Sequence, residues 1–136
     1  MMTELDNLLK KPTLYDVLAT FIYFGTSETS RMLVNKVIMM QLFVDKWGVD
    51  CENAPAELKE ILEDVHFNPG PMAFWSERIG GCFNTITLGG TIAWIANTDY
   101  YWVEKSRIEP FMARLSPETL SHIEELAREY CLRTAR

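Results

Sequence analysis

The side chains that could combine in catalysis are Cys51, Asp64 and His66, which lie in one stretch of the sequence. A thiol, a carboxylate and an imidazole can together make a nucleophilic site. Their spacing is not specific to that chemistry, and a histidine before a proline-rich turn is more typical of a packing role. The chain also has no glycine-rich phosphate loop, no Gly-x-Ser-x-Gly elbow and no His-Glu-x-x-His motif. The sequence therefore predicts a protein that is not an enzyme and has no catalytic residues.

Metal-binding residues are equally sparse. The chain has two histidines and three cysteines, and the cysteines are widely spaced. A zinc module needs close pairs of ligands, and a disulfide framework needs an even number of cysteines. We therefore expect no metal, no cofactor, and free thiols of the kind found in a reducing cytosol.

The N-terminus and the length of the chain bear on location and organisation. Glu4 and Asp6 stand where a signal peptide would carry basic residues. No run approaches the roughly 20 apolar residues that a membrane span requires. We expect a cytoplasmic protein, folded as a single domain over residues 1–136, without a membrane segment.

Acidic residues dominate the segment between residues 45 and 64. The formal net charge of the chain is −6. Nucleic-acid binding depends on neutralising phosphates, so this sign makes nucleic acid an unfavourable partner. A solvated helix face is the simpler explanation of the acids. The alternative is a docking surface for a basic protein partner, with Glu60 and Asp64 among the contacts.

Aromatic residues cluster near the middle of the chain at Trp94, Tyr100, Tyr101 and Trp102. Some of them must cover a helical layer, since alternate residues of a strand face the core. Tyrosine and tryptophan are also enriched at the centres of protein interfaces. We therefore predict that these four residues contribute to a partner-binding surface.

Apolar residues at helical spacing predict helices along most of the chain. Thr13 with Asp16 has the pattern of a capping box, Thr26 or Ser27 could cap the second helix, and Ser116 precedes a proline at the start of the last. Glycines 25 and 80–81 are expected to end helices. The predicted helices cover 14–24, 28–47, 55–65, 72–79, 106–114 and a final segment from residue 117.

The strand signals lie between residues 83 and 103. Residues 83–88 and 91–96 are rich in β-branched and aromatic side chains, and Gly89-Gly90 suits the turn of a hairpin. Residues 100–103 can add a third strand. The expected fold class is α+β, a mostly helical domain with a small three-stranded antiparallel sheet made of hairpin 83–96 and strand 100–103.

Lys36 interrupts the apolar arc of the predicted 28–47 helix. A lysine in such a place can extend its ammonium to solvent or pair with a buried acid. The alternative is a charge held at a functional site.

Three segments together resemble the Panacea (SocA-like, phage-associated) antitoxin domain. The segment 33–43 resembles a helix of that family in which a lysine interrupts apolar residues. The segment 67–75 resembles its aromatic-x-x-Gly-Pro turn, and 115–130 is similar to its closing helix. The resemblance implies a helical domain with a small β element, an antitoxin that neutralises a toxin by direct contact, and no cofactor. It further implies that Lys36, Gly70 and Pro71 are scaffold residues of the family motif.

These observations favour a non-catalytic protein-binding module of antitoxin type, with a toxin as partner and possible homodimer formation. One alternative is a phage or mobile-element inhibitor that binds a host or defence protein. Another is a winged-helix DNA-binding protein with hairpin 83–96 as the wing, although the helix at 72–79 offers only Arg78 as a basic residue. A fourth is an enzyme that uses Cys51 or His66.

Overall fold

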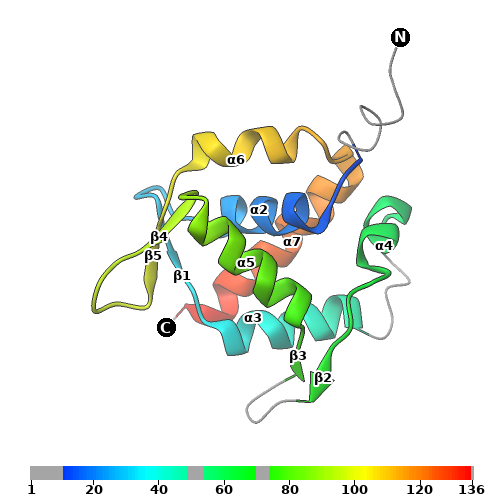
Figure 1. Cartoon of the computed structure of the whole chain (residues 1–136), viewed down its shortest axis with the longest axis horizontal. Coiled ribbons are helices and arrows are strands. Elements are labelled where there is room, and N and C mark those ends of the chain that lie inside the picture. Colours follow the sequence, from blue (N-terminus) through cyan, green and yellow to red (C-terminus); the bar gives the residue numbers. More distant parts are fainter. Residues whose placement is uncertain (1–10, 49–53, 70–73, 136) are drawn as a thin grey trace.

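Helices build most of the molecule, and three short strands close one end of it (Figure 1). The computed structural model describes residues 11–48, 54–69 and 74–135. The helices are α2 (Leu14–Gly25), α3 (Lys36–Phe43), the π-helix η1 (Val44–Gly48), α4 (Ala56–Leu62), α5 (Glu77–Leu88), α6 (Lys105–Met112) and α7 (Pro117–Thr134). The strands are β1 (Arg31–Leu33), β2 (Asn68–Pro69), β3 (Phe74–Trp75), β4 (Ile92–Trp94) and β5 (Tyr100–Val103). The predicted α+β class with a three-stranded antiparallel sheet is confirmed.

The central element is α2, which contacts α5, α6 and α7 (Figure 1). Its first turn is fixed as predicted, because the Asp16 carboxylate accepts a hydrogen bond from the backbone N–H of Thr13 (2.7 Å). Asp16 is itself buried, and its carboxylate lies 3.2 Å from Nε of Arg114. Along the rest of the helix nearly every side chain is buried, which is typical of a helix covered on several sides.

The last helix, α7, packs against α2 and α3. It begins where the sequence predicts, because the hydroxyl of Ser116 accepts a hydrogen bond from the N–H of Thr119 (3.3 Å) and Pro117 occupies the first turn. Phe21 of α2 makes edge-on ring contacts with Phe43 and with Tyr130 of α7, at centroid distances of 5.1 and 5.3 Å. These rings join three helices in one core.

The predicted hairpin over residues 83–96 is wrong, because residues 83–88 are the second half of α5. The hydroxyl of Ser76 caps this helix by accepting from the N–H of Ile79 (3.3 Å). Two threonine hydroxyls in the segment bond to carbonyl oxygens one turn earlier. The buried residues recur at the spacing of a helix, which outweighs the β-branched composition: they are Ile79, Cys82, Phe83 and Ile86.

Glycines in and after α5 also differ from expectation. Gly80 and Gly81 lie inside the helix and do not end it. A Cβ on Gly80 would stand 2.8 Å from the ring of Trp75, so the missing side chain makes room for that ring. The Gly89-Gly90 pair ends α5 and leads into β4, with Gly90 at a φ of +82° that suits glycine.

The sheet has the strand order β1–β5–β4, and both pairs are antiparallel. The true hairpin joins β4 to β5 through a turn at residues 97–99. The third strand of the sheet, β1, lies inside the segment predicted as the 28–47 helix. Ser30 adopts a left-handed conformation (φ 59°), which a right-handed helix cannot contain. The N–H of Ser27 bonds to the carbonyl of Arg31 (2.8 Å) and closes a tight loop before the strand.

Because of β1, the helix that follows begins at Lys36. Neither Thr26 nor Ser27 caps it; the cap is Asn35, whose side chain accepts from the N–H of Ile38 (3.1 Å). Lys36 is therefore an exposed residue of the first turn, and the predicted place in the middle of a buried apolar arc is wrong.

The remaining predicted helices are confirmed with shifted ends. The 55–65 segment forms α4 over a shorter range, the 106–114 segment forms α6, and the 72–79 segment becomes helical only at Glu77 because residues 74–75 pair with 68–69 as β3 and β2.

Candidate binding surface

The turn between β4 and β5 is fixed by side chains as well as backbone. Asn97 takes a left-handed conformation (φ 66°), which asparagine tolerates better than most residues. The hydroxyl of Thr98 donates to the carbonyl of Ile95 (2.8 Å) and accepts from the N–H of Tyr100 (3.1 Å). The indole N–H of Trp94 donates to the carbonyl of Thr98 (2.7 Å). A turn with these bonds holds the strands, and the rings they carry, in defined positions.

Strand register assigns each residue of the sheet to one of its two faces. Directly paired residues project to the same face, and the face alternates along a strand. One set, with Met32, Ile92 and Val103, is buried against the helices. The other set forms two rows across the sheet, and we call these six residues the outer sheet face: Leu33–Tyr100–Ile95 and Arg31–Trp102–Ala93.

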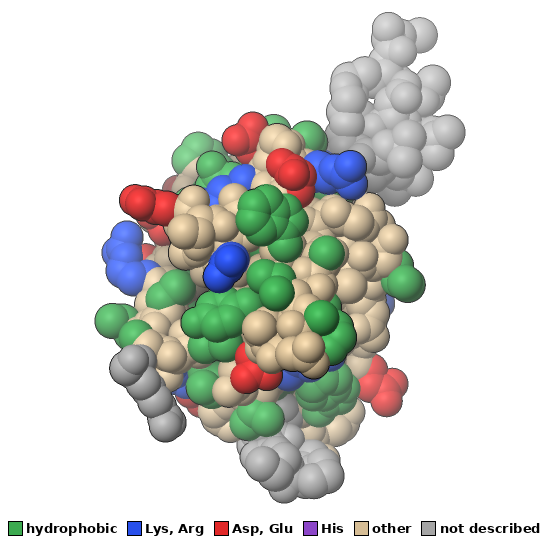
Figure 2. Space-filling model, turned by 90° about the vertical axis from the view of Figure 1, so that its left-hand side faces the viewer, with side chains coloured by type: hydrophobic (Ala, Val, Ile, Leu, Met, Phe, Trp, Pro, Cys, Tyr) green, Lys and Arg blue, Asp and Glu red, His purple; other side chains and the backbone are tan. Residues whose placement is uncertain are grey.

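The outer sheet face is largely apolar and accessible. Tyr100 is 44% exposed and Trp102 is 47% exposed. Arg31 and Ala93 are exposed, whereas Leu33 and Ile95 are half-buried at its margins. The view onto this end of the molecule shows hydrophobic side chains gathered there, with cationic and acidic side chains among and around them (Figure 2).

The two other predicted aromatic residues do not belong to this face. Tyr101 points inward, where its ring meets that of Phe83 edge-on at 5.7 Å, so it packs against the helices and its partner contact stays a prediction. Trp94 pairs with Tyr101 and lies on the same side of the sheet, yet it is 58% exposed. The reason is that the β4–β5 hairpin projects beyond the helices (Figure 1).

One cation lies on the outer sheet face, and two others follow its strands and contact rings on the helix side. Arg31 has no carboxylate partner among the described residues. Lys36, which follows β1, places its ammonium 5.6 Å from the ring centre of Phe83. Lys105, which follows β5, places its ammonium 4.8 Å from the ring centre of Tyr23. These contacts with aromatic faces stabilise a cation without neutralising it.

The acidic residues predicted to bind a partner lie elsewhere. Glu60 is on α4 and Asp64 follows it, at the opposite end of the molecule from the sheet (Figure 1). The Glu60 carboxylate pairs with Lys11 (3.1 Å), and Asp64 is exposed. The structure therefore does not bring these acids together with the aromatic residues. Gly70 and Pro71 lie outside the described residues.

One edge of the sheet is closed by hydrogen bonds. The carbonyl of Arg31 accepts from the N–H (2.8 Å) and the hydroxyl (3.1 Å) of Ser27. The carbonyl of Leu33 accepts from the hydroxyl of Tyr130 on α7, and this hydroxyl also accepts from the N–H of Asn35 (2.9 Å). The outward carbonyls of β1 are thus occupied, and β1 is anchored to the core.

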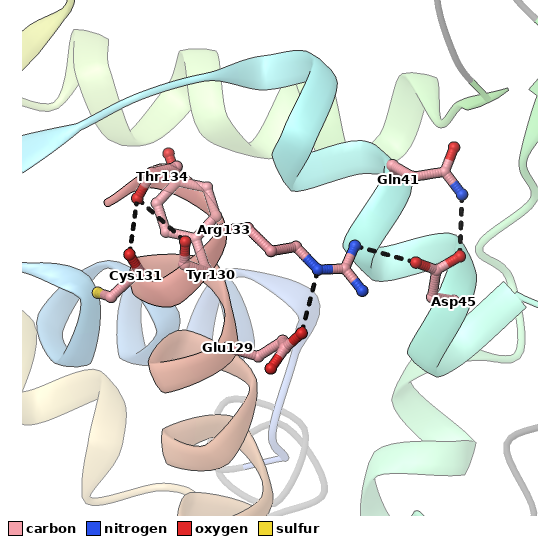
Figure 3. Close-up of polar contacts among 7 residues, drawn as sticks. All are labelled: Gln41, Asp45, Glu129, Tyr130, Cys131, Arg133 and Thr134. Carbon is pink, nitrogen blue, oxygen red and sulfur yellow. Dashed lines mark hydrogen bonds and ion pairs between the residues drawn. The ribbon is translucent and has the colours of Figure 1, made fainter. Parts of the chain in front are cut away.

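A second polar cluster ties α7 to the π-helix. Arg133 reaches from α7 to Asp45 of η1 (3.0 Å) and to Glu129 of its own helix (3.2 Å), as Figure 3 shows. Gln41 donates to the other oxygen of Asp45 (2.9 Å). The hydrogen bond with Asp45, and then that with Glu129, raises the pKa of the Arg133 guanidinium despite some burial. These contacts tie η1 to the end of α7.

The titratable groups of the described residues show no sign of a reactive centre. Burial raises the pKa of the Cys82 thiol, although Arg78 and a hydrogen bond from Tyr15 lower it in part. Burial also raises the pKa of the Cys131 thiol. A raised pKa keeps a thiol protonated and therefore weakly nucleophilic. Cys51 lies outside the described residues, and the predicted grouping with Asp64 and His66 stays untested.

His122 of α7 lies half-buried beside an open depression of about 450 Å³. Burial lowers the pKa of the imidazole, with Lys46 acting in the same direction and Glu125 opposing it. Among the described residues, no group of three or more histidine, cysteine or acidic side chains could hold a metal ion.

Comparisons with known proteins give no match: no protein family, curated protein or solved structure resembles this chain closely enough to be aligned with it. Within the described part of the chain, no helix is both long and apolar enough to cross a membrane.

Proposed function

We propose that the protein is a non-catalytic binding module of antitoxin type, which neutralises a partner protein by covering part of it with the outer sheet face. The observation that carries the proposal is the pair of rings at Tyr100 and Trp102. They are neighbours on one face of one strand, and each is close to half exposed.

Burial of such rings contributes a large share of the binding free energy in protein interfaces. Tyrosine and tryptophan are among the residues most often found as interface hot spots, where truncation costs about 2 kcal/mol or more. Both side chains have few rotatable bonds, so little conformational entropy is lost on binding. The turn bonded by Thr98 and the strand anchored by Tyr130 hold the surface in place before a partner arrives.

Co-expression with the product of the adjacent gene tests this proposal. We expect that product to arrest growth alone, to be harmless with the wild-type chain, and to co-purify with it. Trp102→Ala and Tyr100→Ala should each weaken protection and co-purification. Leu132→Ala is the matched control, since Leu132 is an exposed apolar residue on α7. The antitoxin role is lost if the neighbouring product is harmless and does not co-purify.

A host or defence protein is the alternative partner for the same surface. One pull-down distinguishes the two partners, a toxin and a host protein. It uses host lysate to which the adjacent gene product has been added. Retention of a host protein that Trp102→Ala abolishes, without the adjacent product, would favour an inhibitor of the host.

The order of elements favours a second candidate, a winged-helix DNA-binding protein. A helix, α5, directly precedes the β4–β5 hairpin, as a recognition helix precedes a wing. However, α4 and the β2–β3 pair separate α3 from α5, where a helix-turn-helix has a short turn. The charged residues of α5 are Glu77 and Arg78, which cancel. A duplex DNA mobility shift that weakens with salt and with Arg78→Ala would support this candidate.

A further inference from the structure

The one charged residue of the outer sheet face, Arg31, defines what chemistry a partner would need. It lies in the same row as Trp102 and directly across from it. The ion pairs of the described residues use other cations, namely Lys11, Arg114, Arg128 and Arg133. Arg31 therefore presents a guanidinium beside an exposed indole, with no carboxylate paired to it from the described residues.

Two acids lie at the ends of β5 and outside the outer sheet face: Asp99 precedes the strand and Glu104 follows it. The Glu104 carboxylate accepts a hydrogen bond from the hydroxyl of Ser106 (3.0 Å). Lys36 and Lys105 follow strands of the sheet, but their ammonium groups rest on rings of α5 and α2 on the helix side. The charge of the outer sheet face itself is that of Arg31, so the complementary charge is negative, although the whole chain carries a net charge of −6.

The size of the face indicates a short segment as occupant. A fully buried aromatic side chain removes about 150–250 Å² from solvent, so the half-exposed rings of Tyr100 and Trp102 offer roughly 200 Å² together. A stable complex of two globular surfaces buries about 800 Å² on each partner. Packing of these two rings against the same rings of a second copy would fall well short of that area.

We propose that the outer sheet face binds a short acidic and apolar segment of the partner protein, an inference that rests on the proposed function. Apolar side chains of the segment cover Tyr100 and Trp102, and a carboxylate beside them pairs with Arg31. The guanidinium can donate two parallel hydrogen bonds to one carboxylate, which a lysine at this position could not do.

Selection of peptides from a displayed random library on the full-length chain tests this inference. The same library is selected on four variants: Trp102→Ala, Tyr100→Ala, Arg31→Glu, and the control Arg128→Glu, which makes the same charge change at an exposed site of α7. All variants must first show the circular dichroism and cooperative unfolding of the wild type. Two aromatic variants are included so that a folding defect in one does not end the test.

We expect wild type and Arg128→Glu to enrich peptides with carboxylates beside apolar residues, and the aromatic variants to enrich none. Arg31→Glu should bind the acidic peptides at least about tenfold more weakly and should shift the selection toward basic ones. Binding should also weaken with added salt, since the pair lies at the surface.

The unfavourable outcomes separate the two proposals. If peptides depend on Trp102 but show no preference for acids, or if Arg31→Glu leaves the preference unchanged, the acidic segment is excluded and the binding face stands. If wild type and both aromatic variants enrich the same peptides, or none, the face itself is excluded. A wild-type dimer that Trp102→Ala converts to monomer would assign the face to a second copy and overturn the inference.

Discussion

Tyr130 shows how much one hydroxyl group can join. The group donates to the carbonyl of Leu33 and accepts from the N–H of Asn35, while the ring packs on Phe21. It therefore connects the end of α7 to the junction between β1 and α3, and it supports the strand that carries Arg31. Removing only the hydroxyl isolates this contribution from the packing of the ring.

We expect Tyr130→Phe to lower the free energy of unfolding by about 1–3 kcal/mol, because two backbone groups in a buried region lose their hydrogen-bond partner. Urea denaturation measures the change. Tyr100→Phe is the matched control, since that hydroxyl is on an exposed side chain, and it should change stability by less than about 0.5 kcal/mol. Equal losses in the two variants would contradict the role given to the Tyr130 hydroxyl.

The same residue predicts a dependence of stability on alkaline pH. Burial raises the pKa of Tyr130 from 10.0 to about 12. The unfolded chain releases the phenol proton near pH 10, whereas the folded chain keeps it until about pH 12. The stabilising contribution is therefore complete below pH 10 and is lost as the pH rises through this window, by up to about 3 kcal/mol. The difference between wild type and Tyr130→Phe, measured by denaturation from pH 8 to 12, should shrink accordingly; a constant difference would contradict it.

Residue exposure in the aromatic cluster was predictable only in part. Alternation along a strand requires Tyr100 and Trp102 to share one face and Tyr101 to take the other, but the sequence does not say which face is buried. The exposure of Trp94 depends on how far the β4–β5 hairpin projects beyond the helices behind it, which the sequence does not state. Arg31 could not be identified, because it fell within a segment predicted to be helical.

At the scale of elements, α5 shows how local composition can mislead. Its second half is rich in threonine and isoleucine, which favour strands, yet its buried positions follow helical spacing and its hydroxyls bond within the helix. The two glycines inside it differ in their surroundings. Gly81 has open space around it, whereas Gly80 faces the ring of Trp75.

Alanine at these two glycines should have different effects on stability. Gly81→Ala should stabilise the protein by roughly 0.5–1 kcal/mol, since alanine restricts the unfolded chain and suits a helix interior. Gly80→Ala should give no such gain, because its Cβ displaces the Trp75 ring. Thermal unfolding ranks the variants, and a shift in tryptophan fluorescence should accompany Gly80→Ala alone. The same gain in both variants would show that Trp75 moves freely.

Helix termini were predicted best when a cap and an amphipathic pattern agreed. Thr13 with Asp16 and Ser116 with Pro117 gave the correct starts of α2 and α7. The start of α3 was missed because Ser27 offers equally good capping chemistry, and only the left-handed Ser30 and the pairing of β1 with β5 exclude it. Residues 31–33 pair with residues 100–102, and no local sequence pattern predicts pairing between segments so far apart.

At the scale of the molecule, the core forms around rings that come from distant segments. Phe21, Phe43 and Tyr130 meet edge-on, and the π-helix adds Trp47, which stacks on Phe43 at 4.7 Å. All four are buried. Because α2, α3 and α7 share this cluster, we expect them to unfold together.

Phe21→Ala should therefore cost about 3–5 kcal/mol, a large share of the 5–15 kcal/mol typical of a domain. Trp102→Ala removes a larger side chain from the surface and should cost less than about 1 kcal/mol. Denaturation followed by circular dichroism and by fluorescence should give a single coincident transition for both. A Phe21→Ala variant that loses only one helix signal would argue against a shared core.

The closed edge at β1 limits how the sheet can grow. A sheet grows into a fibre when strands of successive copies pair side by side. This growth requires two open edges on every copy, one to receive a strand and one to offer it. The outward carbonyls of β1 are taken by Ser27 and Tyr130, so within this three-stranded sheet strand addition is directed to the edge of β4. Strand addition between copies would therefore stop at a dimer. The Tyr130 hydroxyl, which anchors β1 to α7, would in this way also prevent polymerisation.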